Sequence, residues 1–70
     1  MEPTGHRLAI MWRHEAWRCE YWENRTGGRL LLFQGRHLVE NRGVDGAYET
    51  VRQSSIWLKK LRAGGPNARQ

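Results

Sequence analysis

The chain of 70 residues is long enough for one small domain and too short for a second. It carries twelve Lys and Arg against seven Asp and Glu, which gives a net charge of +5 and a pI of about 10.4. A chain of this size buries only about 60% of the surface that its unfolded form exposes, which predicts modest stability. The single cysteine, Cys19, excludes an internal disulfide and a zinc site built from cysteine pairs.

The sequence predicts neither a membrane span nor a secretory leader. No apolar run approaches the roughly 20 residues of a spanning helix, and no signal-peptide apolar region follows Met1. A lone thiol is typical of a reducing compartment. We therefore expect a soluble cytoplasmic protein.

Residues 1–15 are expected to be loose or partly ordered, because Pro3 and Gly5 lie in a stretch without periodicity. The apolar segment 7–12 is too short for periodicity to distinguish a strand from a packed turn, and both interpretations stay open. The ordered domain is predicted over residues 16–62, followed by a disordered tail over 63–70.

Three strands are predicted over residues 16–24, 29–34 and 37–41. The first alternates, which predicts one face with Trp17, Cys19 and Tyr21 and another with Arg18, Glu20 and Trp22. The second contains an unbroken apolar run over 30–33, which is typical of a central strand.

Two glycine-containing turns are predicted to join these strands. Gly27 and Gly28 can take positive φ at no steric cost. Gly35 and Arg36 fit a two-residue type II′ turn. That turn would place Leu32 opposite Val39 and Phe33 opposite Leu38.

A helix is predicted over residues 46–62. Asp45 is a suitable N-cap, and Gly64 with Pro66 would end the helix. Its face toward the sheet is predicted to carry a stripe of Tyr48, Val51, Ser55 and Leu58, widened by Ala47 and Leu61.

These elements predict an α+β fold, a three-stranded antiparallel β-meander packed against one C-terminal α-helix (β-β-β-α). One helix covers only one face of a sheet. The other face would keep Trp22 and some of the apolar residues Leu31, Phe33 and Leu38. Ile56 and Trp57 also fall off the predicted helix stripe. Exposed apolar patches of this kind are typical of binding surfaces.

Interleaved arginine and tryptophan predict a nucleic-acid surface, because guanidinium groups bind phosphates and aromatic rings stack on bases or enter grooves. The predicted contact residues are Arg18, Trp22, Arg25, Arg29 and Arg36, and DNA is favoured over RNA. The alternative interpretation is that the tryptophans form the core and the arginine stems shield it.

A second hypothesis is a small protein-interaction module. It would be a homodimer, or an adaptor or inhibitor of a larger protein, docking through Trp22 and its neighbours or through Ile56 and Trp57. Another interpretation of Trp57 is that it packs against the segment 7–12. In the module the arginines would aid solubility or meet an acidic partner.

No pattern in the sequence predicts catalysis or a cofactor. His6, His14 and His37 lack metal-ligand spacing, and Cys19 is better explained as a small core residue than as a nucleophile. Gly27 and Gly28 lack the Lys-Ser/Thr of a phosphate loop. We therefore expect a non-enzymatic protein without a cofactor, a metal ion or a small-molecule substrate.

Overall fold

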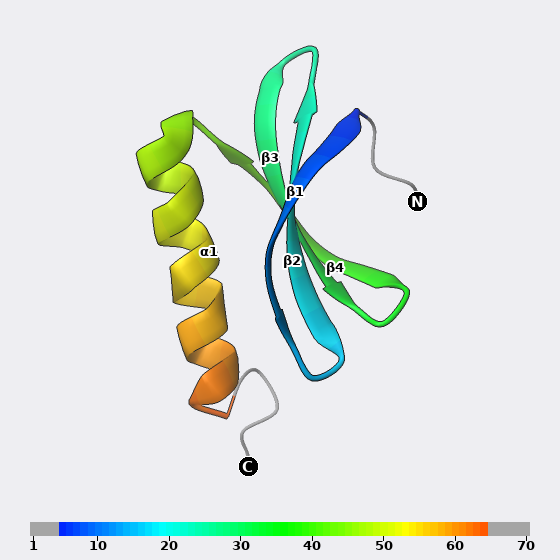
Figure 1. Cartoon of the computed structure of the whole chain (residues 1–70), viewed down its shortest axis with the longest axis vertical. Helices are drawn as coiled ribbons and strands as arrows, with labels where there is room; N and C mark the ends of the chain where they lie inside the picture. The colour runs from blue at the N-terminus through cyan, green and yellow to red at the C-terminus, as the bar shows by residue number, and fades with distance from the viewer. Residues whose placement is uncertain (1–4, 65–70) are drawn as a thin grey trace.

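The computed structural model describes residues 5–64, which form one antiparallel sheet and one helix (Figure 1). The sheet has four strands in the order β1-β2-β3-β4, so each strand pairs with its neighbour in the chain. The elements are β1 (His6–His14), β2 (Trp17–Asn24), β3 (Gly27–Gln34), β4 (His37–Val44) and α1 (Gly46–Arg62). The α+β class and the meander agree with the prediction.

The prediction of a three-stranded sheet is wrong, because the segment before Ala16 supplies β1 as a further edge strand. Arg7 pairs with Trp22, and His14 pairs with Trp17. The register shifts twice, at Leu8 and at Met11. Each bulge inserts one extra residue, which destroys the two-residue alternation that identifies a strand in the sequence. Residues 1–4 and 65–70, part of the predicted loose ends, lie outside the described residues.

The hairpin between β3 and β4 has the predicted two-residue turn. Gln34 pairs with His37, and Gly35 has a φ of 62°, as the first turn residue of type II′ requires. Phe33 lies opposite Leu38 as expected, but Leu32 lies opposite Glu40 and not opposite Val39. A bulge after Leu38 causes this shift, and β4 then continues to Val44, beyond its predicted end.

Helix α1 begins and ends at the predicted residues. Asp45 occupies the N-cap position, but its side chain makes no capping hydrogen bond. The backbone N–H of Asp45 instead donates to Glu49 Oε1 at 2.9 Å. At the other end, the Gly64 N–H donates to the Leu61 carbonyl at 3.2 Å, and Gly64 has a φ of 114°.

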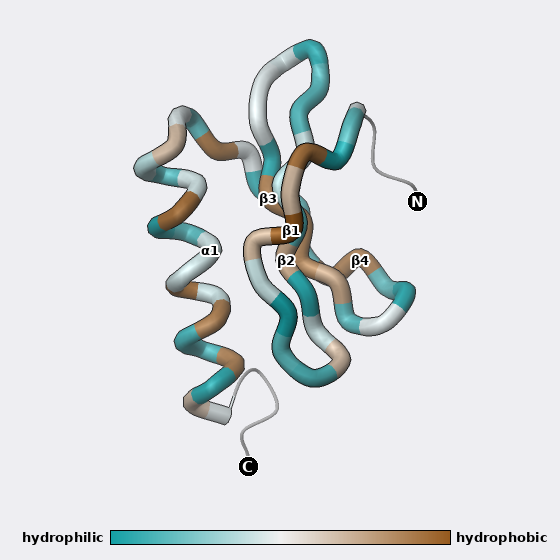
Figure 2. Tube along the Cα trace, viewed as in Figure 1, coloured by the Kyte–Doolittle hydropathy of each residue, from teal (hydrophilic) through white to brown (hydrophobic). Residues whose placement is uncertain are grey.

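The core lies between α1 and one face of the sheet. Its buried members are Cys19, Leu30, Leu32 and Trp57, and partly buried side chains pack around them, namely Met11, Trp12, Trp17, Tyr21, Val44 and Leu61. Apolar and polar residues alternate along α1, as expected for a helix with one buried side (Figure 2).

The side of α1 that faces the sheet differs from the prediction by roughly a third of a turn. Its buried residues are Thr50, Ser54 and Trp57, whereas Tyr48 is 82% exposed and Val51 is 55% exposed. The Trp12 indole N–H donates to the Ser54 carbonyl at 2.8 Å and helps to set this orientation. Small side chains at Thr50 and Ser54 let the helix lie close to the sheet, and the large Trp57 ring fills the core.

Candidate nucleic-acid interface

The sheet face opposite α1 is not covered by any other element among residues 5–64. We call it the open sheet face. Strand alternation and register place the following residues on it: Arg7, Ile10 and Arg13 from β1, Arg18, Glu20 and Trp22 from β2, Arg29, Leu31 and Phe33 from β3, and Leu38 and Asn41 from β4. The predicted separation of Trp17, Cys19 and Tyr21 from Arg18, Glu20 and Trp22 is confirmed, because the former three pack in the core.

The open sheet face is strongly basic. It carries four guanidinium groups and one carboxylate, that of Glu20, a net charge of +3. Arg13 and Arg18 lie directly opposite each other across β1 and β2. Like charges in directly opposed positions of an antiparallel pair destabilise the sheet.

The Glu20 carboxylate organises the centre of this face. Arg18 Nε donates to Glu20 Oε2 at 2.6 Å, and Trp22 Nε1 donates to Glu20 Oε1 at 2.9 Å. Arg7 Nη1 lies 3.5 Å from Glu20 Oε2. The Glu20 side chain is only 2% exposed, although no helix covers it, because its neighbours on the face surround it.

These contacts predict a specific pH dependence of stability. Burial by itself raises the pKa of Glu20, but the hydrogen bonds from Arg18 and Trp22 and the charges of Arg18 and Arg7 outweigh it, so the pKa is lowered from 4.5. A lowered pKa in the folded state contributes stability above the unfolded-state pKa, and this contribution is lost as the pH falls through the folded-state pKa. Urea unfolding below about pH 4.5 should therefore show a steeper loss of stability for the wild type than for Glu20→Gln. Parallel pH profiles for the two proteins would contradict this assignment.

The aromatic rings of the open sheet face lie beneath or beside polar groups. The Arg18 guanidinium lies over the Phe33 ring, 4.3 Å from its centroid, and Phe33 is 8% exposed. Trp22 is half-buried, and its indole N–H is already bonded to Glu20. The face consequently presents guanidinium groups above an apolar layer, and does not present a row of bare rings.

The structure brings three of the predicted contact residues, Arg18, Trp22 and Arg29, onto the open sheet face. Arg29 Nε donates to Asn41 Oδ1 on the same face. Arg25 and Arg36 are exposed in the β2–β3 and β3–β4 turns, which lie at opposite ends of the sheet.

The sequence prediction did not include Arg7, Arg13 or Glu20 among the site residues of this face. Arg7 and Arg13 belong to β1, whose bulges hid the strand. Glu20 was placed on this face but was not recognised as a partner of its neighbours. The available signal was the Arg-x-Glu-x-Trp spacing over 18–22, which puts an acid between an arginine and a tryptophan on one side of a strand.

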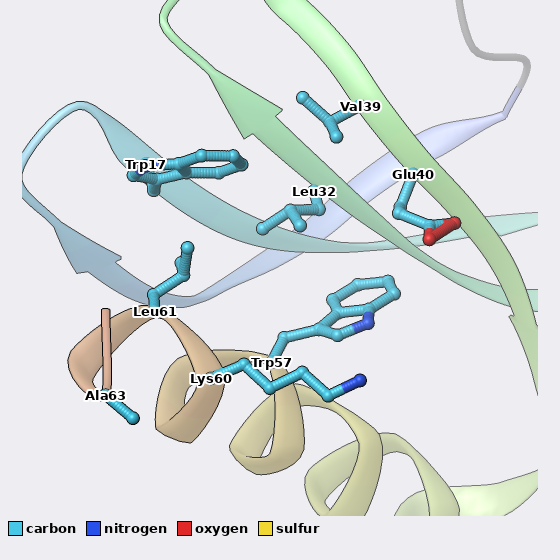
Figure 3. Close-up of a pocket in the computed structure, with 8 residues that line it drawn as sticks. All are labelled: Trp17, Leu32, Val39, Glu40, Trp57, Lys60, Leu61 and Ala63. Carbon is cyan, nitrogen blue, oxygen red and sulfur yellow. The ribbon is translucent and has the colours of Figure 1, made fainter. Parts of the chain in front are cut away.

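The two predicted protein-contact residues, Ile56 and Trp57, are not fully exposed. Trp57 is 6% exposed and belongs to the core, and Ile56 is half-buried. Trp57 instead borders a groove of about 510 Å³ between the C-terminal half of α1 and strands β2 to β4. Figure 3 shows its lining residues, which are mainly apolar with one acid and one base: Trp17, Leu32, Val39, Glu40, Trp57, Lys60, Leu61 and Ala63.

The described residues 5–64 contain no group of three His, Cys, Asp or Glu side chains placed to hold a metal ion. Burial, and then the nearby Glu20 charge, raise the pKa of Cys19 to about 12. The thiol is therefore protonated at neutral pH and is a poor nucleophile. Within the same part of the chain, no helix is long and apolar enough to cross a membrane.

Comparison of the chain with protein-family models, with curated proteins and with solved structures finds no match.

Proposed function

We propose that this protein is a non-enzymatic nucleic-acid-binding protein that contacts DNA through the open sheet face. One observation carries the proposal: the sheet face that α1 leaves uncovered carries four arginines, and its single acid, Glu20, is buried among them. Such a partner is consistent with a cytoplasmic location.

Phosphate binding accounts for the charge arrangement. A phosphate bound at Arg13 would reduce the repulsion between Arg13 and the directly opposed Arg18. Arg25 and Arg36 at the two ends of the sheet extend the cationic surface along the strands. Arginine donates two parallel hydrogen bonds to a phosphate, which fixes the orientation of the bound backbone.

The packing of the aromatic rings favours a duplex over a single strand. Proteins that bind single strands without sequence preference stack successive bases on exposed rings. Here the Phe33 ring lies beneath Arg18, and Trp22 is half-buried. Double-helical RNA has a major groove too narrow for side chains to read. Duplex DNA is therefore the favoured ligand.

Tryptophan fluorescence and anisotropy test this proposal. The protein is titrated with a labelled mixed-sequence DNA duplex of about 16 base pairs, and with one of its single strands, across a range of salt concentrations. With four to six arginines on phosphates, the slope of log K against log salt should be about −4 to −5. Quenching should be stronger with the duplex. An affinity that does not fall with added salt would overturn the proposal.

A protein-interaction module is the second candidate, and a different surface favours it. Tyr48 and Val51 are 82% and 55% exposed on the outer side of α1. The groove beside Trp57 is apolar and bordered by charges of both signs, Glu40 and Lys60. Sedimentation equilibrium tests the homodimer. A dimer that dissociates in a Tyr48→Ser/Val51→Ser variant would support it, and a monomer at about 100 μM argues against it.

A further inference from the structure

Arg18 is the most firmly held arginine on the open sheet face. Its Nε donates to Glu20 at 2.6 Å, and its Nη1 donates to the Gly35 carbonyl at 2.8 Å. Its guanidinium also lies over the Phe33 ring. Three contacts on three sides of one group leave its plane little freedom to turn.

The remaining N–H donors of Arg18 are available to a ligand. A guanidinium has five N–H donors. Two of them are used by Glu20 and Gly35, and the other three have no hydrogen-bond partner among residues 5–64. The Arg18 side chain is 33% exposed. Arg18 therefore presents the free N–H groups of Nη1 and Nη2 to solvent in a fixed orientation, as a fork of paired donors.

Arg7 and Arg13 are held more loosely than Arg18. Arg7 is 55% exposed, and among residues 5–64 its one side-chain contact of this kind is the 3.5 Å ion pair with Glu20. Arg13 is exposed on the edge strand β1. Loosely held side chains can contact the phosphates of a duplex whatever its base sequence. A held fork loses less freedom on binding and accepts only a pair of acceptors at matching positions.

The position of Arg18 on the sheet indicates that it would contact a base edge of the DNA and not a phosphate. Arg18 lies on the inner strand β2, as Arg29 does on β3, but Arg29 makes one hydrogen bond where Arg18 makes two. Arg7 and Arg13 lie on the edge strand β1, and Arg25 and Arg36 lie at the turns. Neighbouring strands lie about 4.8 Å apart, and the major groove is about 12 Å wide. A sheet resting in the groove would therefore put its rim near the two phosphate backbones and its centre near the base edges.

We propose that Arg18 reads guanine in the major groove of duplex DNA, donating from Nη1 and Nη2 to O6 and N7, and that Glu20 is the positioning residue that holds the guanidinium in place. The inference rests on the proposed DNA-binding function and adds a sequence preference to it. Paired donors to guanine O6 and N7 are the most common specific arginine contact in this groove.

The test uses duplexes that contain about twelve random base pairs. Duplexes retained by the wild-type protein are sequenced, and guanine should be enriched at one or more positions. Replacing that guanine with 7-deazaguanine removes the N7 acceptor and keeps the base pair. This replacement should weaken wild-type binding by about 5- to 150-fold. Because it leaves the protein unchanged, the result does not depend on whether a variant folds.

Four variants, each checked for native circular dichroism, separate Arg18 from its neighbours. Arg18→Ala and Arg18→Lys should lose the discrimination between guanine and 7-deazaguanine. Arg13→Ala should keep it and lower the salt slope by about 1. Glu20→Gln, which adds one net positive charge, should bind random duplex more tightly but discriminate less. A merely structural role for Glu20 would not shift affinity and discrimination in opposite directions.

The possible failures are distinct. If the wild type binds no duplex, the proposed function fails and the inference fails with it. If it binds with the expected salt slope but enriches no guanine, or is indifferent to 7-deazaguanine, only the inference is overturned. It is also overturned if Arg18→Ala retains the full discrimination.

Discussion

Replacing Trp57 with alanine should unfold the protein or leave only a small fraction folded at 25 °C. Trp57 is 6% exposed and is the one residue of α1 in the buried cluster with Cys19, Leu30 and Leu32. Truncating a buried tryptophan to alanine costs about 3–5 kcal/mol. A native domain has about 0.05–0.15 kcal/mol of stability per residue, so this loss is comparable with the whole free energy of unfolding of such a short chain.

Urea unfolding followed by far-UV circular dichroism measures this effect. Tyr48→Ala is the matched control, since it removes an aromatic ring that is 82% exposed on the same helix, and it should change the free energy of unfolding by less than about 0.5 kcal/mol. If Trp57→Ala keeps the wild-type stability while Tyr48→Ala unfolds the protein, α1 packs with the opposite side toward the sheet, and the orientation described above is wrong.

Replacing Arg7, Arg13 and Arg25 together with glutamine should weaken duplex DNA binding by two to three orders of magnitude. Each phosphate contact contributes about 0.9 to the slope of log K against log salt, so three contacts contribute about 2.7. At about 0.1 M salt this corresponds to a loss in affinity of roughly 500-fold. Anisotropy titrations with a labelled duplex at several salt concentrations give both the loss and the slope.

The matched control removes the same charge from the other side of the molecule. Arg52, Lys59 and Arg62 are exposed on α1, and replacing all three with glutamine also lowers the net charge from +5 to +2. This control should lose much less affinity and keep the salt slope. Equal losses in the two triple variants would mean that DNA binding follows net charge alone, and the open sheet face would then not be the interface.

Much of the local structure follows from the sequence because short-range rules decide it. The bounds of α1, the Gly35 turn and the division of β2 into two faces agree with prediction. Each depends on residues close in sequence: a glycine that allows positive φ, a cap at the helix start, or a side-chain period of two.

The wrong predictions concern features that depend on contacts between residues far apart in the sequence. β1 has two bulges that remove its periodicity, and it is held in the sheet by pairing with β2. The helix side that packs on the sheet could not be read from hydropathy, because Tyr48, Val51 and Leu58 form a more apolar stripe than Thr50 and Ser54. The contact between Trp12 and the Ser54 carbonyl joins residues 42 positions apart, and no window of the sequence contains both.

The candidate site was also only partly predictable from the sequence. A basic chain with one covered and one uncovered sheet face is predictable from the residues alone, since composition sets the charge and a single helix can cover only one face. The burial of Glu20 among Arg7, Arg18 and Trp22, and the contact of Arg18 with Phe33, depend on how the strands pack together. These contacts join three strands, and strand register, which sets such neighbours, depends on the packing of the whole sheet.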